Sequence, residues 1–275
     1  MSDKPQPLVS VVTVVRNGMP FLVENLDSVA GQDYPALEHW IIDGGSTDGT
    51  LELVRARSAK LAGWISEPDA GIAEAFNKGL ARARGDYISF LNADDALASP
   101  GAISGLIEGA RERGWPMILH GDCDLIERDS GAFLYRFVYH YSRRRFLRFV
   151  IPPHPGMLVH RKFFERYGRF DTSFRISMDY ELQLRGFPEF HAVRVPVVAA
   201  RVRTGGMSTL DPMQGVEENL RALRMNGHLR SPLHEAGIRA YYRLRFAARG
   251  LLEALGIYRQ FVALRQRLSR RRAGL

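Results

Sequence analysis

The sequence predicts an α/β fold with a doubly wound, mixed sheet, followed by a basic helical extension. Apolar, β-branched stretches alternate with helical patterns over residues 8–122, which is typical of a sheet covered by helices on both faces. A chain of 275 residues with 45% hydrophobic composition can bury a core of that size. The arginines gather towards the C-terminal end. We therefore expect a sheet domain over residues 1–210 and a helical extension over residues 211–275.

Runs of apolar residues define the expected strands, and helical patterns lie between them. The stretch LVSVVTVV is apolar along nearly its whole length, as in a strand buried on both faces of a parallel sheet. The strands expected in this part are residues 8–15, 39–43, 85–92 and 116–122. The helices expected between and after them are residues 20–31, 48–60 and 71–84 and a segment that opens with Ser99 and Pro100, a cap followed by a proline.

The alternation is less regular after residue 123. The stretch at 135–149 is aromatic and basic, and its pattern assigns no element. The expected elements are strands at residues 156–161 and 192–202, short helices at residues 162–167 and 178–186, and helix from about residue 213 onward.

Charge and cysteine content exclude some classes of protein. Thirteen arginines, no lysine and two acidic residues follow position 220, a net charge of +11, and because the whole chain carries +8, residues 1–220 carry −3. A basic tail on a mildly acidic domain argues against a nucleic-acid partner. A single cysteine, no leader pattern and no apolar run of about 18 residues predict a cytoplasmic protein that is not integral to the membrane.

Polar residues follow three of the expected strands, in the stretches VVRNG, IIDGGSTDGT and FLNADD. Because the carboxyl ends of parallel strands meet at one edge of a sheet, these stretches can share one ligand. Asp43 can accept a hydrogen bond from a base or a ribose, whereas Asp48 also fits a helix cap. Asp94 and Asp95 form an oxygen-rich pair that suits Mg²⁺ or Mn²⁺ together with phosphate, or else a solvated turn.

An ordered set of motifs resembles the family 2 glycosyltransferases, which have the GT-A fold, and among them the bacterial enzymes that build polysaccharide or glycolipid glycans. The motifs are VSVVTVVRNG, IIDGGSTDGT, SEPDAGIAEAFNKGLARARGDYISFLNADD, PPHPGMLVHRKFFERYGRFD, FRISMDYELQLR and RTGGMS, within residues 8–210. The resemblance implies transfer of a sugar, with inversion, from a UDP-, GDP- or dTDP-linked donor to a hydroxyl of a glycan or lipid-linked acceptor.

The resemblance also implies a bound Mn²⁺ or Mg²⁺ ion that stabilises the leaving diphosphate. The aspartate-x-aspartate signature of the family stands here as Asn92-Ala93-Asp94, so its first carboxylate is replaced. The resemblance makes Asp94 the metal ligand, with Asp95 as a second ligand, and Asn92 a contact to the ribose or to water. Metal independence stays open as an alternative because of the replaced carboxylate.

The acceptor hydroxyl must lose its proton during transfer, which calls for one general base. The resemblance places this catalytic base at Asp179 in ISMDYEL, where Met178 replaces the acidic neighbour of relatives. Glu181 is the alternative base. Asp179 also fits a helix cap.

The remaining donor contacts are implied by the resemblance in the same way. The loop RTGGMS would close over the diphosphate, with Arg201 or Arg203 supplying charge. Lys78 also fits a solvated helix charge, and His154 also fits a structural place. The expected donor-binding residues are Thr13, Arg16, Asn17, Asp43, Asp69, Asn77, Lys78, Asn92, Asp94, His154 and Arg203.

The basic tail has three candidate uses. Residues 232–272 place Leu251, Leu255, Tyr258 and Val262 at helical spacing among arginines. Such a helix can lie on an anionic membrane, here the inner face of the cell membrane, and the stretch 135–149 would add to that surface or hold an anionic acceptor. Packing on the sheet domain and a homodimer interface are the alternatives.

Two other functions share some of these features. A sugar-nucleotide nucleotidyltransferase has a similar scaffold and uses Mg²⁺, but it would carry a glycine-rich loop where this chain has VVRNG. A non-catalytic, nucleotide-binding homologue is compatible with the altered NAD and MD motifs.

Overall fold

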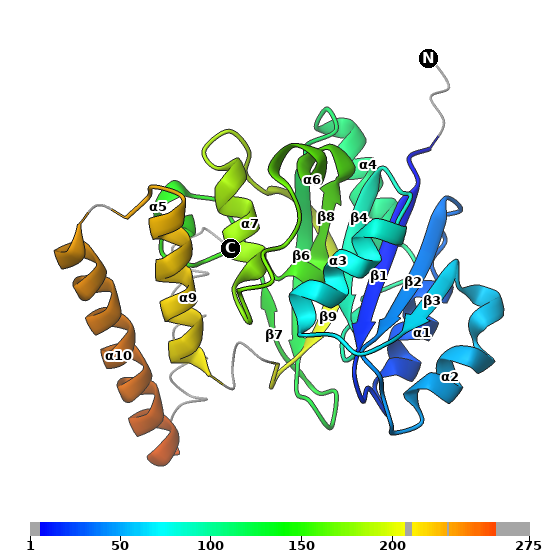
Figure 1. Ribbon diagram of the computed structural model, residues 1–275, viewed down its shortest axis with the longest axis horizontal. Helices are drawn as coiled ribbons and strands as arrows, with labels where there is room; N and C mark the ends of the chain where they lie inside the picture. Colours follow the sequence, from blue (N-terminus) through cyan, green and yellow to red (C-terminus); the bar gives the residue numbers. More distant parts are fainter. Residues whose placement is uncertain (1–5, 207–210, 230, 257–275) are drawn as a thin grey trace. The chain divides into compact units, whose positions relative to one another are not determined.

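Figure 1 shows the computed structural model of the chain, in which residues 6–206, 211–229 and 231–256 are described. The chain divides into two compact units, Met1–Asp211 and Pro212–Leu275. The first contains a mixed sheet with helices, and the second contains α9 (Pro212–Met225) and α10 (Pro232–Ala254).

The sheet of the first unit has a parallel part and a mixed part. Its strand order is β3-β2-β1-β4-β8-β6-β9-β5, with β7 paired to β6 (Figure 1). Strands β3, β2, β1 and β4 are parallel, whereas β8 is antiparallel to both β4 and β6. The strands are β1 (Val9–Val15), β2 (Leu37–Asp43), β3 (Gly63–Ser66), β4 (Tyr87–Asn92), β5 (Ala96–Leu97), β6 (Ile118–Ile126), β7 (Phe133–Phe137), β8 (Met157–His160) and β9 (Val193–Arg203).

Helices pack on both faces because successive side chains of a strand point to opposite faces. Val9 and Val11 of β1 share a core cluster with Ile103 and Leu106 of α4. Val12, on the other face, lies against α3. The helices of this unit are α1 (Leu22–Ala30), α2 (Thr50–Ala56), α3 (Ile72–Arg82), α4 (Ala102–Glu112), α5 (Arg143–Phe146), α6 (Arg161–Tyr167) and α7 (Met178–Gly186), with short 3-10 turns η1 (Ser58–Lys60) and η2 (His154–Gly156).

The expected elements are present, with shifted ends. The six expected strands correspond to β1, β2, β4, β6, β8 and β9, and the helical patterns correspond to α1, α3, α4, α6 and α7. The helix expected over residues 48–60 is divided into α2 and η1. The prediction of a mixed α/β sheet with a helical C-terminal region is confirmed.

Three strands were not expected, for physical reasons. β3 has four half-buried residues and β5 has two residues, which are too few for a hydrophobic pattern. β7 is mostly exposed and pairs with one strand, so it lacks the apolar alternation of a covered strand.

Ion pairs connect the two helices of the second unit. Arg239 of α10 pairs with Glu217 of α9 (2.6 Å), and Arg224 of α9 pairs with Glu235 of α10 (2.6 Å). No helix among the described residues is long and apolar enough to cross a bilayer. Several residues of the expected loop RTGGMS and of the basic tail, including Tyr258 and Val262, lie outside the described residues.

Candidate active site

The loops that follow β1, β2 and β4 emerge at one edge of the sheet. β1 lies between the two other strands, and the parallel register sets Val15 opposite Asp43 and Val14 opposite Asn92. Arg16 follows directly and is exposed. The three polar stretches singled out in the sequence therefore lie close together.

Hydrogen bonds fasten the loop after β1 to the loop after β2. The Asn17 N–H donates to Ser46 Oγ (2.7 Å), and Asn17 Oδ1 accepts from Thr47 N–H (2.9 Å). Asp43 is 1% exposed and accepts from Ser46 N–H (3.2 Å) and Ser66 Oγ (2.6 Å). Asn17 and Asp43, expected at the donor, thus hold the shape of these loops.

Two further aspartates shape the same edge. A Cβ at Gly44 would lie 2.4 Å from Asp69 Oδ2, so glycine is needed for Asp69 to approach this loop. Asp69 Oδ1 also accepts from Gly71 N–H (2.9 Å). Asp48 accepts from the hydroxyl (2.6 Å) and N–H (3.1 Å) of Thr50, the first residue of α2, and these bonds help to lower its pKa. Asp48 therefore holds the turn that leads into α2. The N-cap of that helix is Gly49, which has no side-chain cap bond, so the interpretation of Asp48 as the helix cap is wrong.

A buried chain of hydrogen bonds runs from β2 to the NADD turn, residues 92–95. His39 Nε2 lies 2.9 Å from Thr13 Oγ1, and the Thr13 hydroxyl donates to Asn25 Oδ1 (3.1 Å). Asn25 Nδ2 donates to the carbonyls of Asn92 (2.9 Å) and Asp95 (3.0 Å). Burial lowers the pKa of His39 to about 3. Thr13, an expected donor-binding residue, is fully buried. Through its bond to Asn25 it helps to stabilise the NADD turn.

Asp95 is enclosed within the NADD turn. It is 2% exposed, its Oδ1 accepts from Arg203 N–H (2.9 Å), and its Oδ2 accepts from Asn92 Nδ2 (3.0 Å). Burial and then the neighbouring Asp94 raise its pKa to about 7. Both carboxylate oxygens of Asp95, an expected metal ligand, thus accept hydrogen bonds within the protein.

Asp94 is the more accessible carboxylate of the turn, with 25% of its side chain exposed. Its Oδ2 accepts from Arg128 Nη1 (2.9 Å), which reaches over from the turn between β6 and β7. Among the described residues, no group of three His, Cys, Asp or Glu side chains could hold an ion without other ligands. Mg²⁺ and Mn²⁺ commonly use one or two carboxylates plus substrate phosphates, so Asp94 fits such an ion as the contribution of the protein.

Three arginines gather around Phe21 and Glu24 beside the turn. Arg203 donates to Glu24 and to the Arg128 carbonyl (2.6 Å), and 10% of its side chain is exposed. Arg201 pairs with the other oxygen of Glu24 (2.7 Å) and has 42% of its side chain exposed. The guanidinium groups of Arg128 and Arg203 lie 4.8 and 4.9 Å from the centre of the Phe21 ring. Arg203 is therefore committed to internal contacts, and Arg201 and Arg128 are the more exposed cations.

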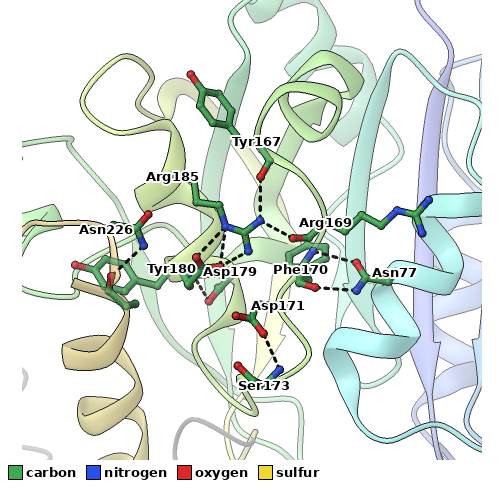
Figure 2. Close-up of polar contacts among 12 residues, drawn as sticks. Asn77, Tyr167, Arg169, Phe170, Asp171, Ser173, Asp179, Tyr180, Arg185 and Asn226 are labelled. Atoms are coloured by element: carbon green, nitrogen blue, oxygen red, sulfur yellow. Dashed lines mark hydrogen bonds and ion pairs between the residues drawn. The ribbon is translucent and has the colours of Figure 1, made fainter. Parts of the chain in front are cut away.

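Asn77 and Lys78, also expected at the donor, tie α3 to neighbouring loops. Asn77 donates to the Phe170 carbonyl (2.8 Å) and accepts from the Phe170 N–H (3.0 Å), as Figure 2 shows. Lys78 Nζ pairs with Glu67 (2.9 Å) and Glu74 (3.1 Å). Both side chains are used within the protein in this structure.

His154 lies between the NADD turn and the start of α7. Its Nε2 is 3.2 Å from Asn92 Oδ1, and its Nδ1 is 3.7 Å from Asp179 Oδ2. The side chains of His154 and Asp179 are 23% and 21% exposed. A Cβ at Gly156, in the same loop, would lie 2.5 Å from Cys123 Sγ, so glycine lets this loop lie close to β6. The structure thus brings Asn92, His154 and Asp179 together.

Asp179 and His154 also line a largely apolar cavity beneath α3, α6 and α7. Aromatic side chains from β4, α3 and α6 form much of its wall, and α7 contributes Leu182. Electrostatic contacts are stronger in apolar surroundings than in water. The aromatic residues of the wall are Phe76, Phe90, Phe163, Phe164 and Phe170.

Glu181, the alternative base, has a different environment. It is 3% exposed, and Arg185 Nε donates to its Oε1 (2.8 Å). Arg185 Nη1 also donates to the carbonyls of Tyr167 (2.9 Å) and Arg169 (2.8 Å), which anchors α7 to the loop after α6 (Figure 2). A carboxylate paired in this way is poorly placed to take a proton from a substrate, whereas the side chain of Asp179 is 21% exposed.

Arg128, Glu24 and Asn25 contribute to the site, and the sequence does not single them out. Arg128 contacts a residue 34 positions away, and it comes from a turn with no recognisable motif. Asn25 and Glu24 lie within α1, and polar residues are common in surface helices, so neither of them indicates a site.

A mixed sheet that carries polar loops at the ends of its parallel strands and helices on both faces is the fold of the GT-A glycosyltransferases. The model of the family "Glycosyl transferase family 2" matches residues 10–168. The chain belongs to glycosyltransferase family 2.

Individual relatives agree with this assignment. The chain is 30% identical over 219 residues to an uncharacterized glycosyltransferase of Mycobacterium tuberculosis, covering 79% of this chain and 83% of the relative. It is 27% identical over 184 residues to a PGL/p-HBAD biosynthesis glycosyltransferase of Mycobacterium bovis, covering 66% and 70%.

Two solved structures share the fold at low sequence identity. Staphylococcus aureus TarS 1-349 in complex with UDP-GlcNAc superposes with a TM-score of 0.64 at 16% identity, covering 86% of this chain and 71% of that one. Mannosyltransferase PcManGT from Pyrobaculum calidifontis, in complex with GDP-Man and Mn²⁺, has a TM-score of 0.61 at 20% identity, covering 96% and 81%. At these identities the likeness concerns the fold alone.

Proposed function

We propose that this family 2 chain is an inverting glycosyltransferase that moves a sugar from a nucleoside-diphosphate donor to a hydroxyl of a glycan or lipid-linked acceptor. The observation that carries the proposal is the contact series from Asn92 through His154 to Asp179. It places a partly exposed carboxylate beside the turn where the diphosphate of a donor would lie.

In the proposed reaction the acceptor oxygen attacks the anomeric carbon of the sugar. The bond between that carbon and the diphosphate oxygen breaks, the proton of the hydroxyl passes to Asp179, and the nucleoside diphosphate leaves with its added negative charge. Attack from the face opposite the leaving group inverts the anomeric carbon. His154 lies beside the carboxylate of Asp179, with its Nδ1 3.7 Å from Oδ2.

The charge of the leaving diphosphate needs a cationic environment. When bound, a Mg²⁺ or Mn²⁺ ion would neutralise part of that charge, with Asp94 as its protein ligand. Arg128 contacts the same carboxylate, and Arg201 lies in the adjoining arginine cluster. These arginines would add positive charge beside the donor.

The proposed donor and acceptor classes are supported by relatives and neighbours rather than by contacts in this site. Two of the solved neighbours hold UDP-GlcNAc and GDP-Man, and a mycobacterial relative is named a PGL/p-HBAD biosynthesis glycosyltransferase. We therefore propose a UDP-, GDP- or dTDP-linked sugar as donor. Exposed Arg16 and the half-buried Asp69 are the residues of the strand-end loops best placed to contact its nucleoside.

The test is a thermal-shift screen of the full chain against UDP-, GDP- and dTDP-sugars, with and without Mn²⁺, followed by an assay of nucleoside-diphosphate release. The matching donor at about 100 times its dissociation constant should add about 2.7 kcal/mol to the free energy of unfolding. Asp94→Ala should lose the increment that depends on Mn²⁺.

Release of the diphosphate separates an enzyme from a non-catalytic binder. A chain that binds a donor without releasing diphosphate, even slowly to water, would be the binding homologue. A chain that no nucleotide-sugar stabilises would overturn the proposal altogether.

A further inference from the structure

Exposed apolar side chains lie along one face of α10 and continue onto Leu255, which directly follows the last residue of the helix. The exposed fractions of these residues are 83% for Leu233, 57% for Tyr241, 72% for Leu244, 62% for Leu251 and 60% for Leu255. Their successive spacings of 8, 3, 7 and 4 positions keep them on one side of a helix. We call these five residues the apolar stripe.

The opposite face of α10 is already used within the second unit. Tyr242 is 8% exposed, and Arg239 and Glu235 pair with residues of α9. The helix hairpin is therefore held by one face of α10, while the apolar stripe lies on another. Contiguous exposed apolar surface of this kind marks an interaction site.

Positive charge flanks the apolar stripe. Arg243 and Arg245 are exposed and stand next to Leu244 in sequence, one on each side of the stripe. The chain from residue 221 onward has a net charge of +11. Two acidic residues of the unit, Glu217 and Glu235, are paired with its arginines, and Glu218 is buried.

We propose that the apolar stripe and its flanking arginines dock the protein on an anionic lipid bilayer. Leucines of the stripe would enter the boundary between headgroups and acyl chains, and the arginines would contact acidic headgroups. A second copy of the chain fits less well, because a pair formed through this face would bring the like-charged Arg243 and Arg245 of both copies together. The proposal does not depend on the catalytic assignment, although it would bring the enzyme to a lipid-linked acceptor.

The test is co-sedimentation of the full chain with vesicles of phosphatidylcholine alone and of phosphatidylcholine with about 30% phosphatidylglycerol. The protein should bind the anionic vesicles and not the neutral ones. Leu244→Glu and Leu251→Glu should each lower the partition coefficient at least about tenfold, because each removes an exposed leucine that would enter the bilayer and adds a charge of the same sign as the lipid. Arg243→Gln or Arg245→Gln should lower it about fivefold.

Met225→Glu is the matched control, since Met225 is 58% exposed in α9 and lies outside the apolar stripe. It should bind vesicles nearly as well as the wild-type chain. Equal binding of Leu251→Glu and Met225→Glu would overturn the proposal. So would a dimer in sedimentation velocity that Leu251→Glu dissociates while vesicle binding is absent, which would assign the stripe to a second copy.

Donor-driven diphosphate release keeps this test separate from the proposed function. The stripe variants should release diphosphate from a nucleotide-sugar at the wild-type rate. A chain that binds vesicles but turns over no donor would retain the docking surface and lose only the catalytic proposal.

Discussion

The strand-end loops and the cleft beside α7 contain the same kinds of polar residue but use them differently. At the ends of β1 and β2, Asn17 and Asp43 bond to neighbouring loop residues, and Asp43 is almost fully buried. Across the cleft, His154 and Asp179 stay about one-fifth exposed and are linked by a longer contact of 3.7 Å. The motif residues of this one site are therefore of two kinds. Some, such as Asn17 and Asp43, fix the shape of loops, and others, such as Asp179, keep atoms available for a substrate.

Asp179 is the residue whose substitution should change activity most. Asp179→Asn should lower the turnover number about 10³-fold, because a general base typically contributes a factor of this order. The melting temperature and donor affinity should stay near wild-type values, since Asn keeps the shape of the side chain. Measurement of steady-state transfer or of diphosphate release, beside a thermal melt, tests both halves.

A matched control for Asp179 is Asp27→Asn on α1, where the carboxylate pairs with Arg57 at an exposed position. Its turnover should equal that of the wild-type chain. If Asp179→Asn also turned over at the wild-type rate, Asp179 would not be the general base. It would then belong with the residues that only shape the site.

Glu181 gives the converse prediction on the same helix. Breaking its buried pair with Arg185 in Glu181→Gln should lower the free energy of unfolding by about 3 kcal/mol, at the low end for buried pairs because Arg185 is partly exposed. Turnover per folded molecule should be unchanged. Urea denaturation and an activity assay on the folded fraction check this, and a stable but inactive variant would instead make Glu181 the base.

The strands that can be predicted from the sequence are those whose side chains are nearly all buried. β1 is buried along its whole length, and its apolar run announces it. β7 has both exposed aromatic and exposed charged side chains, so no periodicity reveals it. Pairing of β8 antiparallel to β4 depends on contacts between distant segments and is invisible to local patterns.

The site divides in the same way. Asp94, His154 and Asp179 were singled out through their motifs, and the structure brings the last two together. The contact between Arg128 and Asp94 and the support of the NADD turn by Asn25 depend on segments 34 and about 70 positions apart, which only the fold brings into contact. A motif identifies a residue type at a position, but burial decides whether its atoms remain available.

His39 is a residue of the first kind, because it is buried and contacts Thr13 behind the NADD turn. In the folded chain burial lowers its pKa from 6.5 to about 3, whereas the unfolded chain takes up a proton below the ordinary value. The contribution of His39 to stability is therefore present above pH 6.5 and is lost as pH falls. Between pH 7 and pH 5 the loss should be about 2 kcal/mol.

His39→Gln should remove this loss while keeping a hydrogen-bonding partner for Thr13. The free energy of unfolding of the variant should fall about 2 kcal/mol less than that of the wild-type chain between pH 7 and pH 5. Urea titrations at the two pH values measure it, and the exposed His140 provides the control substitution His140→Gln. Parallel slopes for His39→Gln and the wild-type chain would contradict the assignment.

Lys78 could be a residue of either kind, since its ammonium forms ion pairs in this structure and was also expected to bind the donor. Its substitution should change stability less than the substitutions above. Its ammonium pairs with Glu67 and Glu74, which are 53% and 35% exposed, so Lys78→Gln should cost only about 0.5 kcal/mol of stability. If these pairs are its only role, the KM for the donor should stay unchanged. An increase in KM of about tenfold or more at constant turnover would show that Lys78 leaves its glutamates to bind the donor, because that pattern marks the loss of a contact made equally in the ground and transition states.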